Sequence, residues 1–136
     1  MSTVKYVRVA SVMTTPPLVI DGLATVEEAM ATMRRENVSS LVIDKRHQGD
    51  EYGLLVVTDI AAKVIARNRS PARTSVYEAM SKPVLTLGGD MDVKYAVRLL
   101  ARFALSRALV LEGGRLAGIV TMRDMVLRTP AEATGA

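Results

Sequence analysis

The chain of 136 residues has no cysteine and no tryptophan, and its only histidine is His47. The lack of cysteine excludes a disulfide scaffold, a thiolate zinc site and a cysteine nucleophile. A lone histidine in a polar turn is far more often solvated than catalytic, and it cannot supply the paired ligands of a zinc site. The thin inventory of acids and bases therefore predicts a protein that is not an enzyme, with no catalytic residues and no metal.

Long hydrophobic runs are also missing, because no segment approaches the roughly 18 apolar residues of a transmembrane helix. The residues after Met1 do not form a secretory signal, so we expect a cytoplasmic protein that does not act at a membrane. A glycine-rich phosphate loop is absent too, since Gly88-Gly89-Asp90 lacks the Lys and Ser or Thr that such a loop needs. The composition, with 49% hydrophobic and 24% charged residues, is that of a globular protein.

The charge is moderately positive, with 18 Lys and Arg against 14 Asp and Glu and a formal net charge of +4. Basic residues gather at 63–69 and at Lys94, Arg98 and Arg102, where the helical spacing is typical of a solvated helix face. The chain has one phenylalanine and four tyrosines and no recognition motif, so a nucleic-acid partner is not expected. A moderate positive balance suits small anionic ligands.

An internal repeat organises the chain. Residues 12–43 align with residues 79–110 at a shift of 67, and after a turn that is two residues longer in the first copy the shift becomes 65. The second shift places Asp59 on Asp124. The predicted organisation is one composite module with repeat 1 at 7–68, a linker at 69–74, repeat 2 at 75–128 and a flexible tail at 129–136.

Each copy is predicted to have the order β-α-β-β-α after a short helical turn. In the first copy the turn is expected at 9–13, strands at 18–20, 41–43 and 53–57, and the last helix at 59–67. In the second copy the turn is expected at 75–80, the strands at 84–87, 108–111 and 116–120, and the last helix at 124–128. The long helices follow Thr25, which forms a capping box with Glu28, and Asp92, which can cap in the same way.

The strands are almost continuously apolar, which predicts that both faces of each sheet are covered. The two copies are expected to pack their sheets together with pseudo-two-fold symmetry and to leave two clefts. Glu112-Gly113-Gly114-Arg115 predicts a tight hairpin. The equivalent turn at 44–52 contains Asp44, Asp50 and Glu51, which we expect to be solvated rather than to bind a cation.

The most informative segment is Gly118-Ile-Val-Thr-Met-Arg-Asp124, where a strand becomes a helix. Thr121 and Asp124 fit two interpretations. They can cap the helix, or the carboxylate can accept hydrogen bonds from two vicinal hydroxyls such as those of a ribose. The start of the helix would then offer free N–H groups to a phosphate, and Arg107 and Arg123 would add charge-assisted contacts.

The whole pattern resembles a tandem pair of CBS domains, a Bateman module, over about residues 7–128. Three segments carry the resemblance: Ser11-Val12-Met13 followed by Pro16, the stretch 38–44, and the stretch 118–124. The resemblance implies an α/β fold of two repeats packed through their sheets, and commonly a homodimer. It also implies a regulatory, signal-transducing role without a required cofactor, with an adenine nucleotide as ligand and an unknown effector protein as partner.

The ligands implied by the resemblance are AMP, ADP or ATP, with S-adenosylmethionine or NAD less expected. In the family the pattern Gly-apolar-apolar-Thr/Ser-x-x-Asp contacts the ribose, which carries over onto Thr121 and Asp124. The other positions implied for this stronger cleft are Arg123, Val12, Met13, Leu18, Val38, Ser39 and Arg107. Those implied for a weaker cleft are Asp59, Thr58, Met80, Leu85, Leu105 and Ser106.

The first copy departs from the family pattern. Val56 stands where a hydroxyl is expected, Thr58 lies two residues later, and Ser40 stands in the place of Arg107. We therefore expect the cleft of Asp124 to bind more tightly than that of Asp59. The alternative is a ligand-free dimerisation or protein-interaction module in which Thr121 and Asp124 are only helix caps.

Overall fold

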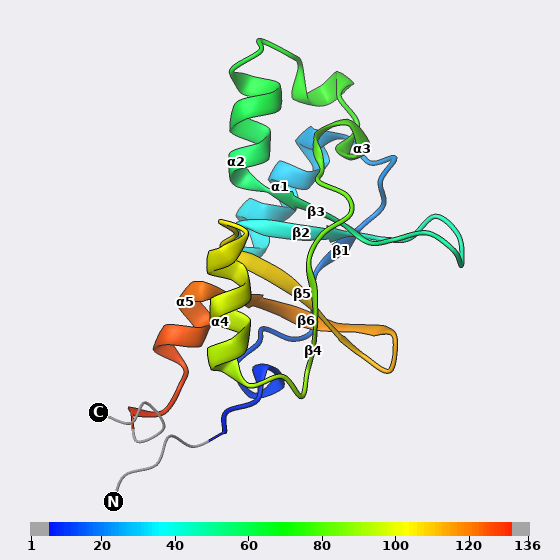
Figure 1. The fold of residues 1–136 in the computed structure, drawn as a ribbon. Helices are drawn as coiled ribbons and strands as arrows, with labels where there is room; N and C mark the ends of the chain where they lie inside the picture. The colour runs from blue at the N-terminus through cyan, green and yellow to red at the C-terminus, as the bar shows by residue number, and fades with distance from the viewer. Residues whose placement is uncertain (1–5, 132–136) are drawn as a thin grey trace, which may run out of the picture. The chain divides into compact units, whose positions relative to one another are not determined.

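The computed structural model describes residues 6–131 and has an α/β fold with two three-stranded sheets (Figure 1). The first sheet consists of β1 (Val19–Ile20), β2 (Ser40–Ile43) and β3 (Gly53–Val56). The second consists of β4 (Thr86–Gly88), β5 (Arg107–Glu112) and β6 (Arg115–Thr121). In each sheet the first two strands are parallel and the last two antiparallel, so the predicted duplication is confirmed at the level of topology.

The helices follow the same repeated order. The first half contains the 3₁₀ turn Val9–Ser11, α1 (Val26–Glu36), and α2 (Val57–Ile60) continued by the π-helical turn Ala61–Ile65. The second half contains the 3₁₀ turn Pro71–Arg73, α3 (Val76–Ala79), α4 (Val93–Arg102) and α5 (Met122–Leu127). Residues 132–136 of the predicted tail lie outside the part of the chain that the structure describes.

The chain forms two compact units that do not coincide with the sequence repeats. The α1 unit is Leu18–Val84, and the α4 unit joins the N-terminal segment up to Pro17 to the chain from Leu85 onward. The short helical turn of each repeat therefore packs on the core built mainly by the other repeat. Val9 and Val12 are buried in the core of the α4 unit, and Val76 and Ala79 in the core of the α1 unit.

The strands contribute buried residues at consecutive positions, as their apolar sequences predict. All four residues of β2 are buried, and so are Ala108, Leu109 and Val110 of β5. Successive side chains of a strand point to opposite faces, so each sheet has two covered faces. In the α4 unit the cluster around Leu100 and Val110 holds α4 and α5 against β5 and β6.

Helix capping follows the sequence closely. Thr25 Oγ1 accepts from the Glu28 amide at 3.1 Å, and the Glu28 carboxylate accepts from the Thr25 amide at 3.0 Å, which confirms the capping box. Asp92 caps α4 by accepting from the Lys94 amide at 3.2 Å. Positive φ angles at Gly113 and Gly114 confirm the tight turn between β5 and β6.

The last helix of each copy begins earlier than predicted. Asp59 and Asp124 were expected to start these helices, but α2 begins at Val57 and α5 at Met122. Each aspartate is the third residue of its helix, and its carboxylate accepts from the amide of the capping residue three positions earlier. The reach of the carboxylate back to that amide is the reason, because it lets the helix begin two residues before the acid.

Two residues of the β2–β3 turn, Arg46 and Asp50, are linked to side chains outside the turn. Lys82 Nζ lies 2.5 Å from the Asp50 carboxylate, with side-chain exposures of 19% and 12%, and the Arg46 amide donates to the same carboxylate at 2.9 Å. Arg46 also donates to the Tyr77 hydroxyl at 2.8 Å. The expectation that Asp50 is solvated is therefore wrong, because a cation 32 residues away in the chain pairs with it.

Acid is expected to weaken this link. The hydrogen bonds from Lys82 and from the amide of Arg46 hold the pKa of Asp50 well below its usual range. The ionised Asp50 carboxylate stabilises the folded state fully above the pKa of an unfolded aspartate, about 3.9, and this stabilisation is lost as the pH falls below that value. We expect the gap in urea midpoint between the wild-type protein and Asp50→Asn to be large at pH 7 and to narrow below about pH 4.

The matched control for this prediction is Asp90→Asn. Asp90 pairs with Arg8 at 2.6 Å, but its side chain is 89% exposed, and exposed ion pairs contribute little to stability. Asp90→Asn should therefore change the urea midpoint little at either pH. A gap for Asp50→Asn that stays constant down to pH 3 would contradict the assignment.

Candidate functional site

Thr121 and Asp124 form a reciprocal cap where β6 becomes α5. Thr121 Oγ1 accepts from the Asp124 amide at 2.9 Å, and Asp124 Oδ2 accepts from the Thr121 amide at 3.2 Å. Asp124 remains 16% exposed at its side chain. A carboxylate has about four acceptor positions, so the cap leaves Asp124 able to accept further hydrogen bonds.

Three arginines surround this cap, and we call Thr121, Asp124 and these arginines the Asp124 corner. Arg107 of β5 is the direct cross-strand partner of Thr121, which places both side chains on one face of the sheet. Burial lowers the pKa of Arg107, and the charge of Asp124 opposes that shift. Arg123 is exposed on α5, and Arg128 Nε lies 3.6 Å from Asp124 Oδ1.

Arg128 is the member of this corner that the sequence analysis missed. Besides facing Asp124, its Nη1 donates to the carbonyl of Met13 at 3.1 Å and to that of Val12 at 3.4 Å. The signal available in the sequence was the spacing of Asp124 and Arg128, since oppositely charged residues four apart on a helix are neighbours. The contact with the N-terminal segment had no local signal, because it joins residues more than 110 positions apart.

The α1 unit contains an equivalent corner with different chemistry, the Asp59 corner of Ser40, Val56, Asp59 and Lys63. Asp59 Oδ2 accepts from the Val56 amide at 3.2 Å, but the valine side chain has no oxygen that could accept a hydrogen bond from the Asp59 amide. Ser40, not arginine, is the cross-strand partner of Val56. Lys63 Nζ lies 3.7 Å from Asp59 Oδ1 and donates to the Ala79 carbonyl at 3.1 Å.

Two glycines allow the N-terminal segment of each repeat to cross the sheet of the other. A Cβ on Gly118 would lie 2.6 Å from the Thr14 carbonyl oxygen and 2.8 Å from Met13 Sδ. A Cβ on Gly53 would lie 2.6 Å from Met80 Sδ and 3.3 Å from the Ser81 carbonyl oxygen. The glycine that opens each motif is therefore required by close packing within its own unit, whatever the unit binds.

The two units divide the predicted ligand contacts. The α4 unit holds Thr121, Arg123, Asp124, Arg107, Val12, Met13, Leu85, Leu105 and Ser106, and the α1 unit holds Asp59, Thr58, Met80, Leu18, Val38 and Ser39. Val12 is buried in the apolar core, so only its main chain is available beside Arg128. Thr58 is exposed on α2 and takes no part in the cap of that helix.

Two of the three amides that were expected to be free at the start of α5 already have acceptors. The Met122 amide donates to the Ser106 carbonyl at 2.8 Å, and the Asp124 amide donates to Thr121 Oγ1. The helix has only six residues. An anionic group near Asp124 would therefore depend mainly on the arginine side chains.

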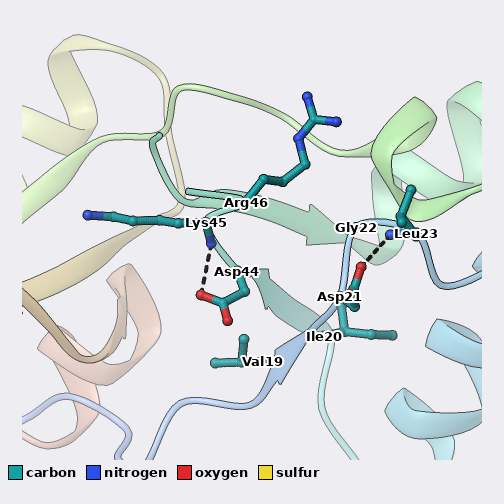
Figure 2. A pocket seen from close by; sticks show the side chains of 8 residues that line it. All are labelled: Val19, Ile20, Asp21, Gly22, Leu23, Asp44, Lys45 and Arg46. Atoms are coloured by element: carbon teal, nitrogen blue, oxygen red, sulfur yellow. Dashed lines mark hydrogen bonds between the residues drawn. The ribbon is translucent and has the colours of Figure 1, made fainter. Parts of the chain in front are cut away.

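A separate pocket lies at the carboxyl ends of β1 and β2, with a volume of about 510 Å³ (Figure 2). Asp21 and Asp44 each accept from a main-chain amide of their own turn, and Figure 2 shows Lys45 and Arg46 extending away from these carboxylates. The equivalent pocket of the α4 unit has different side chains, including Arg8, Asp90 and Glu112. The two pockets share a place in the fold but no common set of ligand-binding groups.

No cluster of acidic residues and histidine that could hold a metal ion occurs within residues 6–131. His47 is exposed in the β2–β3 turn. Over the same residues, every helix is too short or too polar to cross a lipid bilayer.

Comparison with known proteins gives two matches to the model of the CBS domain, at residues 9–65 and 76–129. Among solved structures, a hexameric CBS-CP12 protein from bloom-forming cyanobacteria is 33% identical, with a TM-score of 0.87 over 91% of this chain and 68% of that one. The conserved CBS domain protein TA0289 of Thermoplasma acidophilum is 28% identical, with a TM-score of 0.82 over 95% of this chain and 72% of that one.

Curated proteins are also similar to the chain in sequence. The uncharacterized protein MK0525 of Methanopyrus kandleri is 32% identical over 107 residues, which cover 78% of this chain and 54% of that protein. The CBS domain-containing protein YhcV of Bacillus subtilis is 29% identical over 127 residues, which cover 93% of this chain and 85% of that protein. The chain spans only about half the length of MK0525 and of a 33.4 kDa protein of Thermofilum pendens.

Proposed function

Because the chain belongs to the CBS domain family as a tandem pair, and such a pair is a regulatory module, we propose that it reversibly binds an adenine nucleotide at the Asp124 corner. The proposed ligands are AMP, ADP or ATP, with S-adenosylmethionine and NAD as less favoured members of the same adenosine class. No cofactor is required, and the output passes to a separate effector protein.

The observation that carries this proposal is the environment of Asp124. Its carboxylate keeps free acceptor positions after capping α5, and vicinal ribose hydroxyls are donors that suit such a group. Arg107 and Arg123 supply positive charge for one or more phosphates. An adenine nucleotide thus has partners within one unit for its ribose and for the negative charge of its phosphates.

The charge of the whole unit supports the same assignment. Residues 6–17 and 85–131 contain eight Lys and Arg and four Asp and Glu, a net charge of +4. Residues 18–84 contain nine of each and are neutral overall. A positive field raises the local concentration of an anionic ligand, so the α4 unit is favoured over the α1 unit.

One solved neighbour supports the chemical class of the ligand. The CBS domain pair of protein MJ0100 was crystallised with 5′-methylthioadenosine and S-adenosyl-L-methionine, both adenosine derivatives. That protein is 24% identical with a TM-score of 0.78, a likeness that shows the fold alone. Its ligands make adenosine compounds the natural panel for the first experiment.

The alternative function is a ligand-free dimerisation or protein-interaction module. It is favoured by the reciprocal hydrogen bonds of Thr121 and Asp124, which satisfy a helix cap without any ligand. On this alternative the surface of the protein, and not the Asp124 corner, carries the function.

A thermal-shift screen separates the two functions. The purified protein is heated with AMP, ADP, ATP, NAD, S-adenosylmethionine and a GTP control. We expect a selective adenine ligand at about 100 times its Kd to raise the Tm by several degrees. The rise should vanish in Asp124→Ala, and a flat response to the whole panel by folded protein would favour the interaction module.

A further inference from the structure

We propose that Arg128 is a positioning residue of the nucleotide site, which holds the Asp124 carboxylate in a fixed relation to the main chain of Val12 and Met13. The inference rests on the proposed function and adds a residue that neither the sequence motif nor the cap identifies.

The two oxygens of the Asp124 carboxylate have different partners. One carboxylate oxygen accepts from the Thr121 amide, and the other faces the guanidinium of Arg128 at 3.6 Å. Rotation of the carboxylate about its own bond would break at least one of these contacts. The two together therefore select one orientation, with the remaining acceptor positions directed away from both partners.

The other end of Arg128 holds the N-terminal segment. Its Nη1 donates to the carbonyls of Val12 and Met13, at the end of the 3₁₀ turn Val9–Ser11. Carbonyls at the end of such a turn lack partners within the turn, and an arginine is well suited to satisfy them. One side chain thus joins the acceptor proposed for the ribose to the segment that contains Met13.

The α1 unit repeats this arrangement with a different cation. Lys63 lies four residues after Asp59, faces its carboxylate at 3.7 Å and donates to the carbonyl of Ala79 at the end of α3. Ala79 and Val12 are equivalent under the repeat shift of 67. The arrangement therefore needs a long cation that reaches both groups, and lysine supplies it as well as arginine.

The test compares Arg128→Gln, Arg128→Lys and the control Arg115→Gln, an equal charge loss at an exposed position of β6. Kd is measured for adenosine and for the nucleotide that gives the largest thermal shift, at a temperature well below the Tm of every variant. We expect Arg128→Gln to raise both Kd values about fivefold or more, the range for residues of one network. Arg128→Lys should stay within about twofold of wild type, and Arg115→Gln should leave Kd unchanged.

Adenosine distinguishes positioning from direct contact, because it has no phosphate. A loss seen with the nucleotide but not with adenosine would make Arg128 a phosphate ligand and would overturn the proposal. A lower Tm of unliganded Arg128→Gln with unchanged Kd values would also overturn it, since the residue would then act on stability alone.

Amide hydrogen exchange at residues 9–13 tests the same proposal without any ligand. The amides of Val12 and Met13 donate to the Val9 carbonyl, and we expect both to exchange faster in Arg128→Gln and to recover in Arg128→Lys. If wild-type protein binds no member of the panel, the proposed function fails, and exchange alone decides whether Arg128 holds this segment. Unchanged exchange in Arg128→Gln would overturn the positioning role.

Discussion

Replacing Gly118 by alanine is expected to lower the free energy of unfolding by about 2 kcal/mol, within the range for overpacked sites. The new Cβ would lie 2.6 Å from a main-chain oxygen of Thr14. That oxygen cannot withdraw easily, because Thr14 and Ile119 exchange two backbone hydrogen bonds at 2.8 and 3.1 Å. The urea midpoint of the purified variant measures the loss.

Two other glycines give a graded control for this prediction. At Gly53 the closest atom to a new Cβ is the sulfur of the flexible Met80 side chain, so Gly53→Ala should cost less than Gly118→Ala. At Gly88 nothing lies within 4 Å, and Gly88→Ala should be neutral or slightly stabilising. Equal losses at Gly118 and Gly88 would contradict the close-packing explanation.

Asp124→Ala should weaken binding of the adenine nucleotide at least about tenfold, whereas Asp59→Ala should change it little. A hydrogen bond to a charged group contributes about 1.5–3 kcal/mol, so loss of even one ribose contact reaches this size. In the Asp59 corner Val56 replaces Thr121 and its hydroxyl, and Ser40 replaces Arg107. Isothermal titration calorimetry of both variants measures the difference.

The two aspartate variants also control for each other. Each removes one hydrogen bond to a capping amide, both at 3.2 Å, so we expect similar losses of unliganded stability. Affinity, and not folding, is then the property that separates them. A larger loss of affinity from Asp59→Ala would contradict the proposed asymmetry.

Local features of the fold were predictable from the sequence because short-range chemistry determines them. The capping residues Thr25 and Asp92, the glycine turn at Gly113 and the repeated order of elements all depend on neighbours within a few positions. The start of α5 was placed too late, since an aspartate can act either at the capping position or three residues into the helix. Sequence alone did not choose between these roles.

Contacts between distant segments were not predictable. Val9 and Val12 would complete an apolar core in either repeat, because the two repeats present similar apolar positions. Pattern alone therefore could not assign the N-terminal turn to the α4 unit. The pairing of Asp50 with Lys82, and that of Arg128 with the carbonyl of Met13, likewise depend on the folded chain.

The crosswise placement of the short helical turns has a consequence for the origin of the chain. A single repeat that kept this arrangement would hold a turn that does not pack on its own core, so the turn of a second molecule would have to complete that core. Duplication placed each helical turn on the same chain as the core that it completes, where a high effective concentration replaces association between molecules. A break in the segment 69–74 would return the protein to that earlier condition, in which neither fragment holds a complete core.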